Sequence, residues 1–153
     1  MKTDYKLIAA QIRGLMEEEP FYVPLMANVS ALLFTQLPDV SWAGFYLVRD
    51  GALSLGPFQG KPACIHIPAG RGVCGTAFSE DRTVLVENVH DFPGHIACDA
   101  ASNSEIVVPV HKDGKVVAVL DLDSTSFGRF TEEDEDGLRE AVSVMEEGIR
   151  FQV

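Results

Sequence analysis

Two Asp-Gly dipeptides, at positions 50–51 and 113–114, each lie between two apolar stretches of strand length. Asp-Gly is favoured in the two-residue turns of β-hairpins, where both residues adopt positive φ. The flanking sequences SWAGFYLV and ALSLGPF therefore predict one hairpin over residues 41–58, and SEIVVPV with KVVAVLDLDS predicts another over residues 104–124. Two such hairpins favour an antiparallel sheet over a parallel one.

Helical periodicity precedes, separates and follows the predicted hairpins. One helix is expected near the N-terminus, a second, apolar helix over roughly residues 22–36, and a short one over residues 73–80. Thr131 and Asp134 have the spacing of a capping box at the start of the last helix. The first and last helices present the apolar positions Tyr5, Ile8, Ile12 and Leu15, and Leu138, Val142, Met145 and Ile149.

Short strands are expected over residues 63–68 and 83–89, and a long loop over residues 90–103. Loops of that length are uncommon in compact domains unless they serve a function. The order of elements predicts an α+β fold with a central, largely antiparallel sheet flanked by helices. Residues 1–153 are long enough for one domain, and a second domain is not expected.

The charge balance excludes several classes of partner. The chain has 23 acidic against 12 basic residues, a net charge of −11, which repels nucleic acid and anionic membranes. No apolar run reaches membrane-spanning length, and the charged N-terminus does not resemble a secretory signal. We therefore expect a cytoplasmic protein that acts on a small ligand or a protein partner.

Three cysteines, an odd count for a cytoplasmic chain, argue against a permanent disulfide framework. They are Cys64, Cys74 and Cys98, and each lies in or beside a Gly-rich turn. That context favours reachable thiols over three buried, inert cysteines. Zinc bound by the three cysteines and one histidine is a further alternative, with His66, His90 and His95 as the candidate ligands.

Carboxylates gather near the segment that bears Cys98. Asp121 and Asp123 are two residues apart and share one face of their strand. Glu105 begins the neighbouring strand, so the hairpin brings three acids together. Neighbouring carboxylates raise one another's pKa. Such a cluster is a metal site, a site for an ammonium group, or a source of a protonated acid near neutral pH.

The segments SWAGFYL, LGPFQGKPAC, GRGVCG, FPGHIACDAASNSEIVVP and VLDLDS, in this order, resemble the free methionine-R-sulfoxide reductases, single-domain enzymes of the GAF fold. The resemblance spans nearly the whole chain, and Ala118 is a departure where the family pattern has glycine. It implies thiol-dependent reduction of free L-methionine-(R)-S-oxide to L-methionine. It also implies no bound metal or cofactor, and thioredoxin, with NADPH and thioredoxin reductase, as the external reductant in oxidative stress. Terminal helices through which GAF domains often pair make a homodimer an expectation.

The resemblance assigns roles to matching residues. Cys98 aligns with the nucleophile, which becomes a sulfenic acid, and Cys64 with the thiol that resolves it to an intramolecular disulfide. Cys74 aligns with a third cysteine that relays oxidation or serves as a second resolving thiol. The remaining matches are with substrate-binding positions: Glu105, Asp121 and Asp123 for the ammonium and the sulfoxide oxygen, and Trp42 and Tyr46 for the S-methyl group.

The chemistry of the reaction agrees with these assignments. A sulfoxide oxygen leaves only after protonation, and crowded carboxylates can hold a proton for it. A negative charge left in the cluster would pair with the α-ammonium that a free amino acid carries. An acidic surround keeps the Cys98 thiol neutral unless a group such as His95 offsets it. The alternative function is a non-catalytic GAF module that senses a ligand or redox state. Sensors are usually joined to output domains, so a chain that ends at Val153 favours the enzyme.

Overall fold

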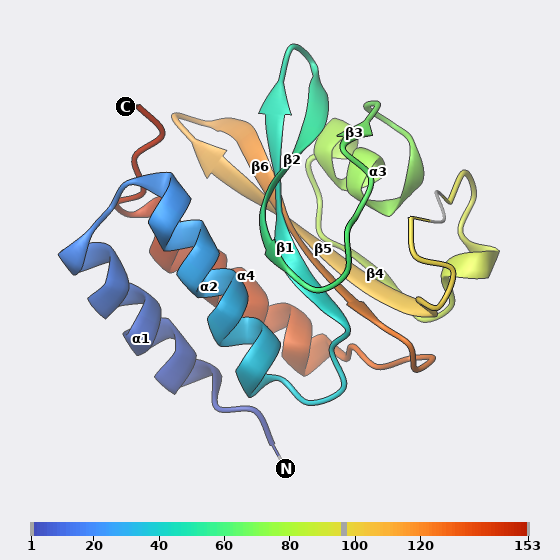
Figure 1. The fold of residues 1–153 in the computed structure, drawn as a ribbon, viewed down its shortest axis with the longest axis horizontal. Coiled ribbons are helices and arrows are strands. Elements are labelled where there is room, and N and C mark those ends of the chain that lie inside the picture. The colour runs from blue at the N-terminus through green and yellow to red at the C-terminus, as the bar shows by residue number, and fades with distance from the viewer. Residues whose placement is uncertain (1, 96–97, 153) are drawn as a thin grey trace.

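The computed structural model describes residues 2–95 and 98–152. A six-stranded sheet in the order β3-β2-β1-β6-β5-β4 lies at its centre, with every neighbouring pair antiparallel. Three helices cover one face of the sheet and one covers the other (Figure 1). The elements are α1 (Tyr5–Glu18), α2 (Tyr22–Gln36), β1 (Trp42–Arg49), β2 (Ala52–Gln59), β3 (His66–Ile67), α3 (Gly72–Glu80), β4 (Val84–Val86), the 3₁₀ helix η1 (Val89–Asp91), β5 (Ser104–Lys112), β6 (Lys115–Ser124) and α4 (Glu132–Glu146). The predicted α+β class is confirmed.

Both Asp-Gly dipeptides form the predicted turns. Asp50 and Gly51 have φ of 53° and 78°, and Asp113 and Gly114 have φ of 53° and 77°. Positive φ at both central residues matches the right-handed twist of the flanking strands. The turns therefore fix the register of the β1–β2 and β5–β6 hairpins.

The main hydrophobic core lies between the sheet and the three-helix layer. α2 packs on β1 and β2, α4 packs on β5, and α1 packs on α4. Alternate residues of the central strands point into this core, among them Phe45, Ile106, Leu120 and Leu122, each 0% exposed. Ala118 also lies in this core, so the departure from the family pattern is on the helix-covered face.

The opposite face of the sheet carries a smaller apolar cluster and the polar residues of interest. α3 packs on β5 and β6, and it contributes Val73, Cys74 and Ala77 to this cluster. β3 lies on the same side of the molecule as α3 (Figure 1). Within the described residues, no helix has both the length and the apolar composition needed to cross a membrane.

Two predicted strands are shorter than the sequence indicated. The strand expected over residues 63–68 is reduced to β3, because Cys64 leaves the sheet edge to form a disulfide with Cys98. The strand expected over residues 83–89 ends at Val86. There the side chain of Asn88 accepts the N–H of His90 and starts η1 instead.

The last helix begins with the predicted capping box. The hydroxyl of Thr131 accepts the backbone N–H of Asp134, and the Asp134 carboxylate accepts the backbone N–H of Thr131. Asp134 also accepts the hydroxyl of Tyr5 at 2.6 Å and pairs with Arg129 at 3.0 Å. Its carboxylate thus joins α1, α4 and the preceding loop at one buried point.

A second polar junction, which sequence analysis did not anticipate, lies at the far end of β5. His111 Nε2 lies 2.6 Å from Asp81 Oδ1 at the end of α3, and His111 Nδ1 lies 2.9 Å from Glu146 Oε2 at the end of α4. Partial burial disfavours the charged imidazolium, but hydrogen bonds and charge from the two carboxylates outweigh it and raise the pKa of His111. Protonated His111 therefore joins elements on both faces of the sheet.

This junction predicts a pH-dependent part of the stability. A raised pKa in the folded state means that the stabilisation is complete below the unfolded pKa of 6.5 and is lost as pH rises through the folded value. We expect His111→Gln to flatten the decline of unfolding free energy above about pH 6.5. Urea unfolding of both proteins at several pH values measures the difference. His66→Gln, at an exposed histidine, is the control, and parallel pH profiles of His111→Gln and the unchanged protein would contradict the prediction.

Candidate active site

The strand register places the predicted site residues in adjacent rows of one sheet face. Trp42 on β1 pairs with Asp123 on β6, which pairs with Glu105 on β5. In the next row of the same face, Asp121 lies opposite Gly44. Alternation along each strand directs these side chains away from the helix-covered core. Residues that are up to 81 positions apart thus meet on a short length of three strands.

A pocket above these rows is lined by the predicted site residues except Cys64, which is joined to the lining residue Cys98. It is lined by the aromatic rings of Trp42 and Tyr46, by Cys74 and Cys98, and by all three acids of the predicted cluster. The structure therefore brings the carboxylates to the part of the chain that bears Cys98, as the sequence predicted. With the disulfide closed, the cavity has a volume of about 60 Å³.

Cys64 and Cys98 form a disulfide in this structure, with Cα atoms 5.5 Å apart. The bond joins the segment between β2 and β3 to the long loop before β5, and closes 34 residues of chain. Both cysteines are half-buried. The alternative of three buried, inert cysteines is therefore wrong for this pair, and the alternative zinc site loses two of its thiols to the bond.

Cys74 is free and buried in the first turn of α3, with 4% of its surface exposed. Its Sγ lies 3.8 Å from Glu105 Oε2 and donates a hydrogen bond to that carboxylate. Burial, followed by the charges of Asp121 and Glu105, raises the pKa of the Cys74 thiol well above its ordinary value. Cys74 is therefore a neutral thiol in this environment.

The three carboxylates hold protons more tightly than exposed acids do. Burial is the largest cause for each, and neighbouring acids add to it. Asp121 raises the pKa of Glu105, Asp123 raises that of Asp121, and Glu105 raises that of Asp123, all well above their ordinary values. Among the described residues, no lysine, arginine or histidine forms an ion pair with any of them. The cluster therefore retains protons unless a cation enters the pocket.

One oxygen of the cluster has no partner. Asp121 is 5% exposed, and its Oδ1 is buried without a hydrogen bond from the described residues. A buried carboxylate oxygen left without a donor costs free energy. A donor that enters the pocket would satisfy this oxygen.

Aromatic rings form one wall of the pocket. The ring centroid of Trp42 lies 5.9 Å from that of Tyr46 and 5.1 Å from that of Phe58. Trp42 Nε1 donates to the carbonyl of Lys61, and the Tyr46 hydroxyl donates to the carbonyl of Cys64. The polar atoms of both rings are thus satisfied at the rim, which leaves the ring faces as apolar surface for a ligand.

His95 lines the pocket, but it does not supply a positive charge there. Partial burial and the neighbouring His90, whose ring centroid lies 6.2 Å away, lower the pKa of His95. A neutral imidazole does not activate Cys98 by charge. It could accept a proton from a thiol.

Two cationic residues of the pocket, Lys61 and Arg71, were not predicted from the sequence. Arg71 stands between Gly70 and Gly72, immediately before α3, in the GRGVCG segment that was used only for the family resemblance. The Gly-Arg-Gly sequence was the available signal. Two glycines allow positive φ on both sides of the arginine, and both adopt it here.

Comparison with known proteins now identifies the family. A GAF domain model matches residues 25–150. Over 142 residues the chain is 54% identical to the free methionine-R-sulfoxide reductase of Escherichia coli K12, with 93% of this chain and 86% of that protein covered. The chain belongs to the free methionine-R-sulfoxide reductases. These reductases are oxidoreductase enzymes.

Solved structures of reductases support the same membership. The fRMsr of Staphylococcus aureus, in complex with its substrate, superposes with a TM-score of 0.93 at 48% identity, and 98% of each chain is covered. The free methionine-R-sulfoxide reductase of Neisseria meningitidis, also in complex with its substrate, gives a TM-score of 0.91 at 40% identity over 96% of this chain and 91% of that one. The predicted GAF fold and reductase family are thus confirmed.

The raised pKa values of the acids predict that the reductase is less stable than it could be. A carboxyl whose folded pKa is raised stabilises the protein below its ordinary pKa, 3.8 for Asp121, and loses that contribution as pH rises through the folded value. Asp121→Asn should therefore raise the unfolding free energy at neutral pH, because it removes a carboxyl that the folded state holds at a raised pKa.

Denaturant unfolding of Asp121→Asn and the unchanged reductase near neutral pH and at acidic pH measures this gain. The two proteins should converge at acidic pH. The matched control is Asp99→Asn, because the Asp99 carboxylate lies in the same pocket but accepts the backbone N–H of Ala101 at 2.9 Å. A lower stability of Asp121→Asn than of the unchanged protein near neutral pH contradicts the prediction.

Proposed function

We propose that this chain reduces free L-methionine-(R)-S-oxide to L-methionine. The observation that carries the proposal is the unpaired Asp121 oxygen within a cluster of three carboxylates, in the same pocket as Cys98. Relatives named free methionine-R-sulfoxide reductase, two of them solved with substrate, support the same conclusion.

The pocket has complementary groups for a free amino acid. The α-ammonium, which methionine inside a polypeptide lacks, would donate to the unpaired oxygen of Asp121 and to its neighbour Asp123. The stacked faces of Trp42 and Tyr46 would contact the S-methyl group. This arrangement favours the free amino acid over a methionine sulfoxide residue in a protein.

The chemical step joins a thiol and an acid. The Cys98 sulfur attacks the sulfoxide sulfur, and Glu105, which holds a proton because its pKa is raised, donates it to the sulfoxide oxygen. The oxygen is transferred to Cys98, which becomes a sulfenic acid, and methionine is released with two electrons gained. His95 accepts the thiol proton in this scheme.

A disulfide completes the first half of the cycle. The Cys64 thiol attacks the Cys98 sulfenic acid, forms the S–S bond and displaces water. The disulfide between the same two cysteines in this structure supports this step. Thioredoxin, regenerated by NADPH and thioredoxin reductase, would return both cysteines to thiols. Because that cycle needs a reducing compartment, we place the enzyme in the cytoplasm.

A coupled assay tests the proposal. NADPH oxidation is followed with thioredoxin, thioredoxin reductase and racemic free methionine sulfoxide. The enzyme should consume about half of the racemate, because one sulfoxide epimer fits a chiral pocket. A GAF module that only senses a ligand should consume none, and a blocked methionine sulfoxide peptide should not be reduced.

Cysteine variants should separate attack from recycling. Cys98→Ser should abolish methionine release, because a hydroxyl does not replace the thiol nucleophile. Cys64→Ser should release about one methionine per chain in a burst and then stall with thioredoxin. Cys74→Ser, at the buried free thiol, is the matched control and should keep continuous turnover. Unimpaired turnover of Cys64→Ser would move the resolving role to Cys74.

Amide variants of the acids should divide into two kinetic classes. Glu105→Gln should lower kcat by about 10²–10⁴-fold and remove the alkaline limb of the pH profile, as expected for loss of a general acid. Asp121→Asn and Asp123→Asn should mainly raise KM, because they weaken the ammonium site. Single-turnover methionine release across the pH range, measured at subsaturating and at saturating substrate, separates the two effects. A normal rate in Glu105→Gln would reject it as the proton donor.

A further inference from the structure

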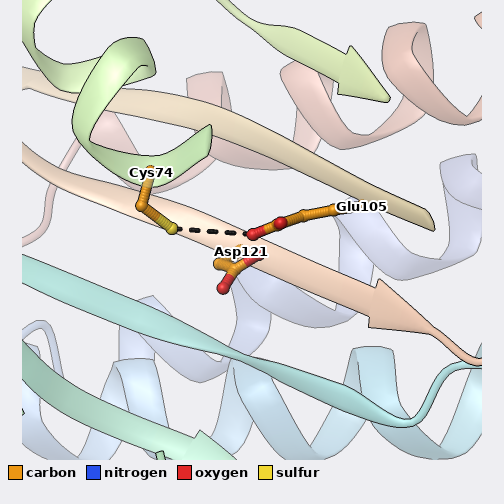
Figure 2. A group of neighbouring side chains, drawn as sticks. All are labelled: Cys74, Glu105 and Asp121. Atoms are coloured by element: carbon orange, nitrogen blue, oxygen red, sulfur yellow. Dashed lines mark hydrogen bonds between the residues drawn. The ribbon is translucent and has the colours of Figure 1, made fainter. Parts of the chain in front are cut away.

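Cys74, Glu105 and Asp121 come from three different elements and turn toward one another (Figure 2), and all three line the pocket. Each offers one ligand atom, and these atoms all lie within 4.8 Å of one another. The Cys74 Sγ to Glu105 Oε2 distance is 3.8 Å. Around a tetrahedral zinc ion, a thiolate sulfur and a carboxylate oxygen are separated by roughly 3.6 Å. The Cys74 and Glu105 ligand atoms therefore already have nearly the separation that one ion requires.

The surroundings of the three groups also favour a cation. All are at least nine-tenths buried, with 4%, 8% and 5% of their surfaces exposed. Asp121 Oδ1 has no hydrogen-bond partner among the described residues, and the half-buried Asp123 lies in the same pocket. A bound cation would give the unpaired oxygen a partner and offset the repulsion between the acids. The cavity of about 60 Å³ has room for an ion and a water ligand.

We propose that Cys74, Glu105 and Asp121 form a binding site for one thiophilic divalent cation of the Zn²⁺ or Cd²⁺ class, and that the ion blocks the substrate pocket. On binding, the metal takes the place of the thiol proton, which is released to solvent, and no electrons are transferred. The ion acts as an inhibitor. It binds Asp121, the acid that the proposed function assigns to the substrate ammonium.

The ligand set determines which ions bind. Thiolate sulfur selects Zn²⁺ and Cd²⁺ over Mg²⁺ and Ca²⁺, which prefer ligands that are all oxygen. The site is also independent of the disulfide, because Cys74 stays free when Cys64 and Cys98 are joined. The oxidised protein, in which Cys74 is the single thiol among the three cysteines, should therefore bind the metal.

A spectroscopic titration of the oxidised protein tests the site without turnover. Cd²⁺ should produce an ultraviolet thiolate-to-cadmium charge-transfer band that saturates at one ion per chain, and Zn²⁺ but not Mg²⁺ should displace it. Glu105→Gln and Asp121→Asn should each weaken Cd²⁺ binding by at least about tenfold, a loss seen even for partners of metal ligands. Asp99→Asn, at another acid of the same pocket, should leave it unchanged.

Absence of the band with excess Cd²⁺, or a Cd²⁺ affinity of both carboxamide variants equal to that of the unchanged protein, overturns the site. These outcomes do not bear on the reductase activity, which the coupled assay tests separately.

Blocking of the pocket is tested in the double variant Cys64→Ser/Cys98→Ser, which has Cys74 as its single thiol and cannot reduce a ligand. Free methionine-(R)-sulfoxide should lower the apparent Cd²⁺ affinity in proportion to its occupancy. If calorimetry shows that the substrate binds and the Cd²⁺ affinity does not change, the ion does not block the pocket. If the substrate itself does not bind, the proposed function fails as well, so the two failures are distinguishable.

Discussion

The pairing register of β1, β6 and β5 is the constraint on which the site depends. It aligns Trp42, Asp123 and Glu105 in one row and places Asp121 in the next. A slip of one residue would move every side chain of a strand to the other face, where the acids would meet the helix-covered core. The Asp-Gly turn at residues 113–114, with positive φ at both residues, joins β5 to β6 and so aligns the three acids. The pairing of β1 with β6, which adds Trp42 to the row, joins strands that are far apart in the chain.

The two faces of the sheet make opposite contributions to the free energy of folding. The face against α1, α2 and α4 buries fully apolar side chains such as Phe45 and Leu120. The other face buries Glu105 and Asp121 beside a thiol, without an ion-pair partner among the described residues. Apolar burial favours folding and carboxylate burial opposes it. The helix-covered core therefore supplies the stability that lets the pocket keep an electrostatically unfavourable set of groups.

The sequence predicted the features that are local in the chain. Both hairpins, the second helix at residues 22–36 and the capping box of Thr131 and Asp134 follow from short patterns, and the structure confirms them. The convergence of the three acids was also predictable, because one hairpin brings them together.

Features that depend on distant segments were less accessible. The pairing of Cys64 with Cys98 across 34 residues entered only through the family resemblance, since three cysteines leave the pairing open. The shortening of β3 follows from that bond. Two further contacts join separate elements, so no local sequence pattern predicts them. They are the contact of Cys74 with Glu105 and the junction of His111 with Asp81 and Glu146.

The alternation of the two faces along β5 and β6 has a consequence for how the gene tolerates change. Ile106, Val108, Leu120 and Leu122 contribute to the helix-covered core, whereas Glu105, Asp121 and Asp123 line the pocket. Adjacent codons are therefore selected for different properties. In a library covering every substitution in these strands, abundance should be lost at the core positions and catalysis at the pocket positions, so each of the two measurements would oscillate with a period of two residues. Abundance and activity scores taken together would therefore reveal which residues of each strand share a face.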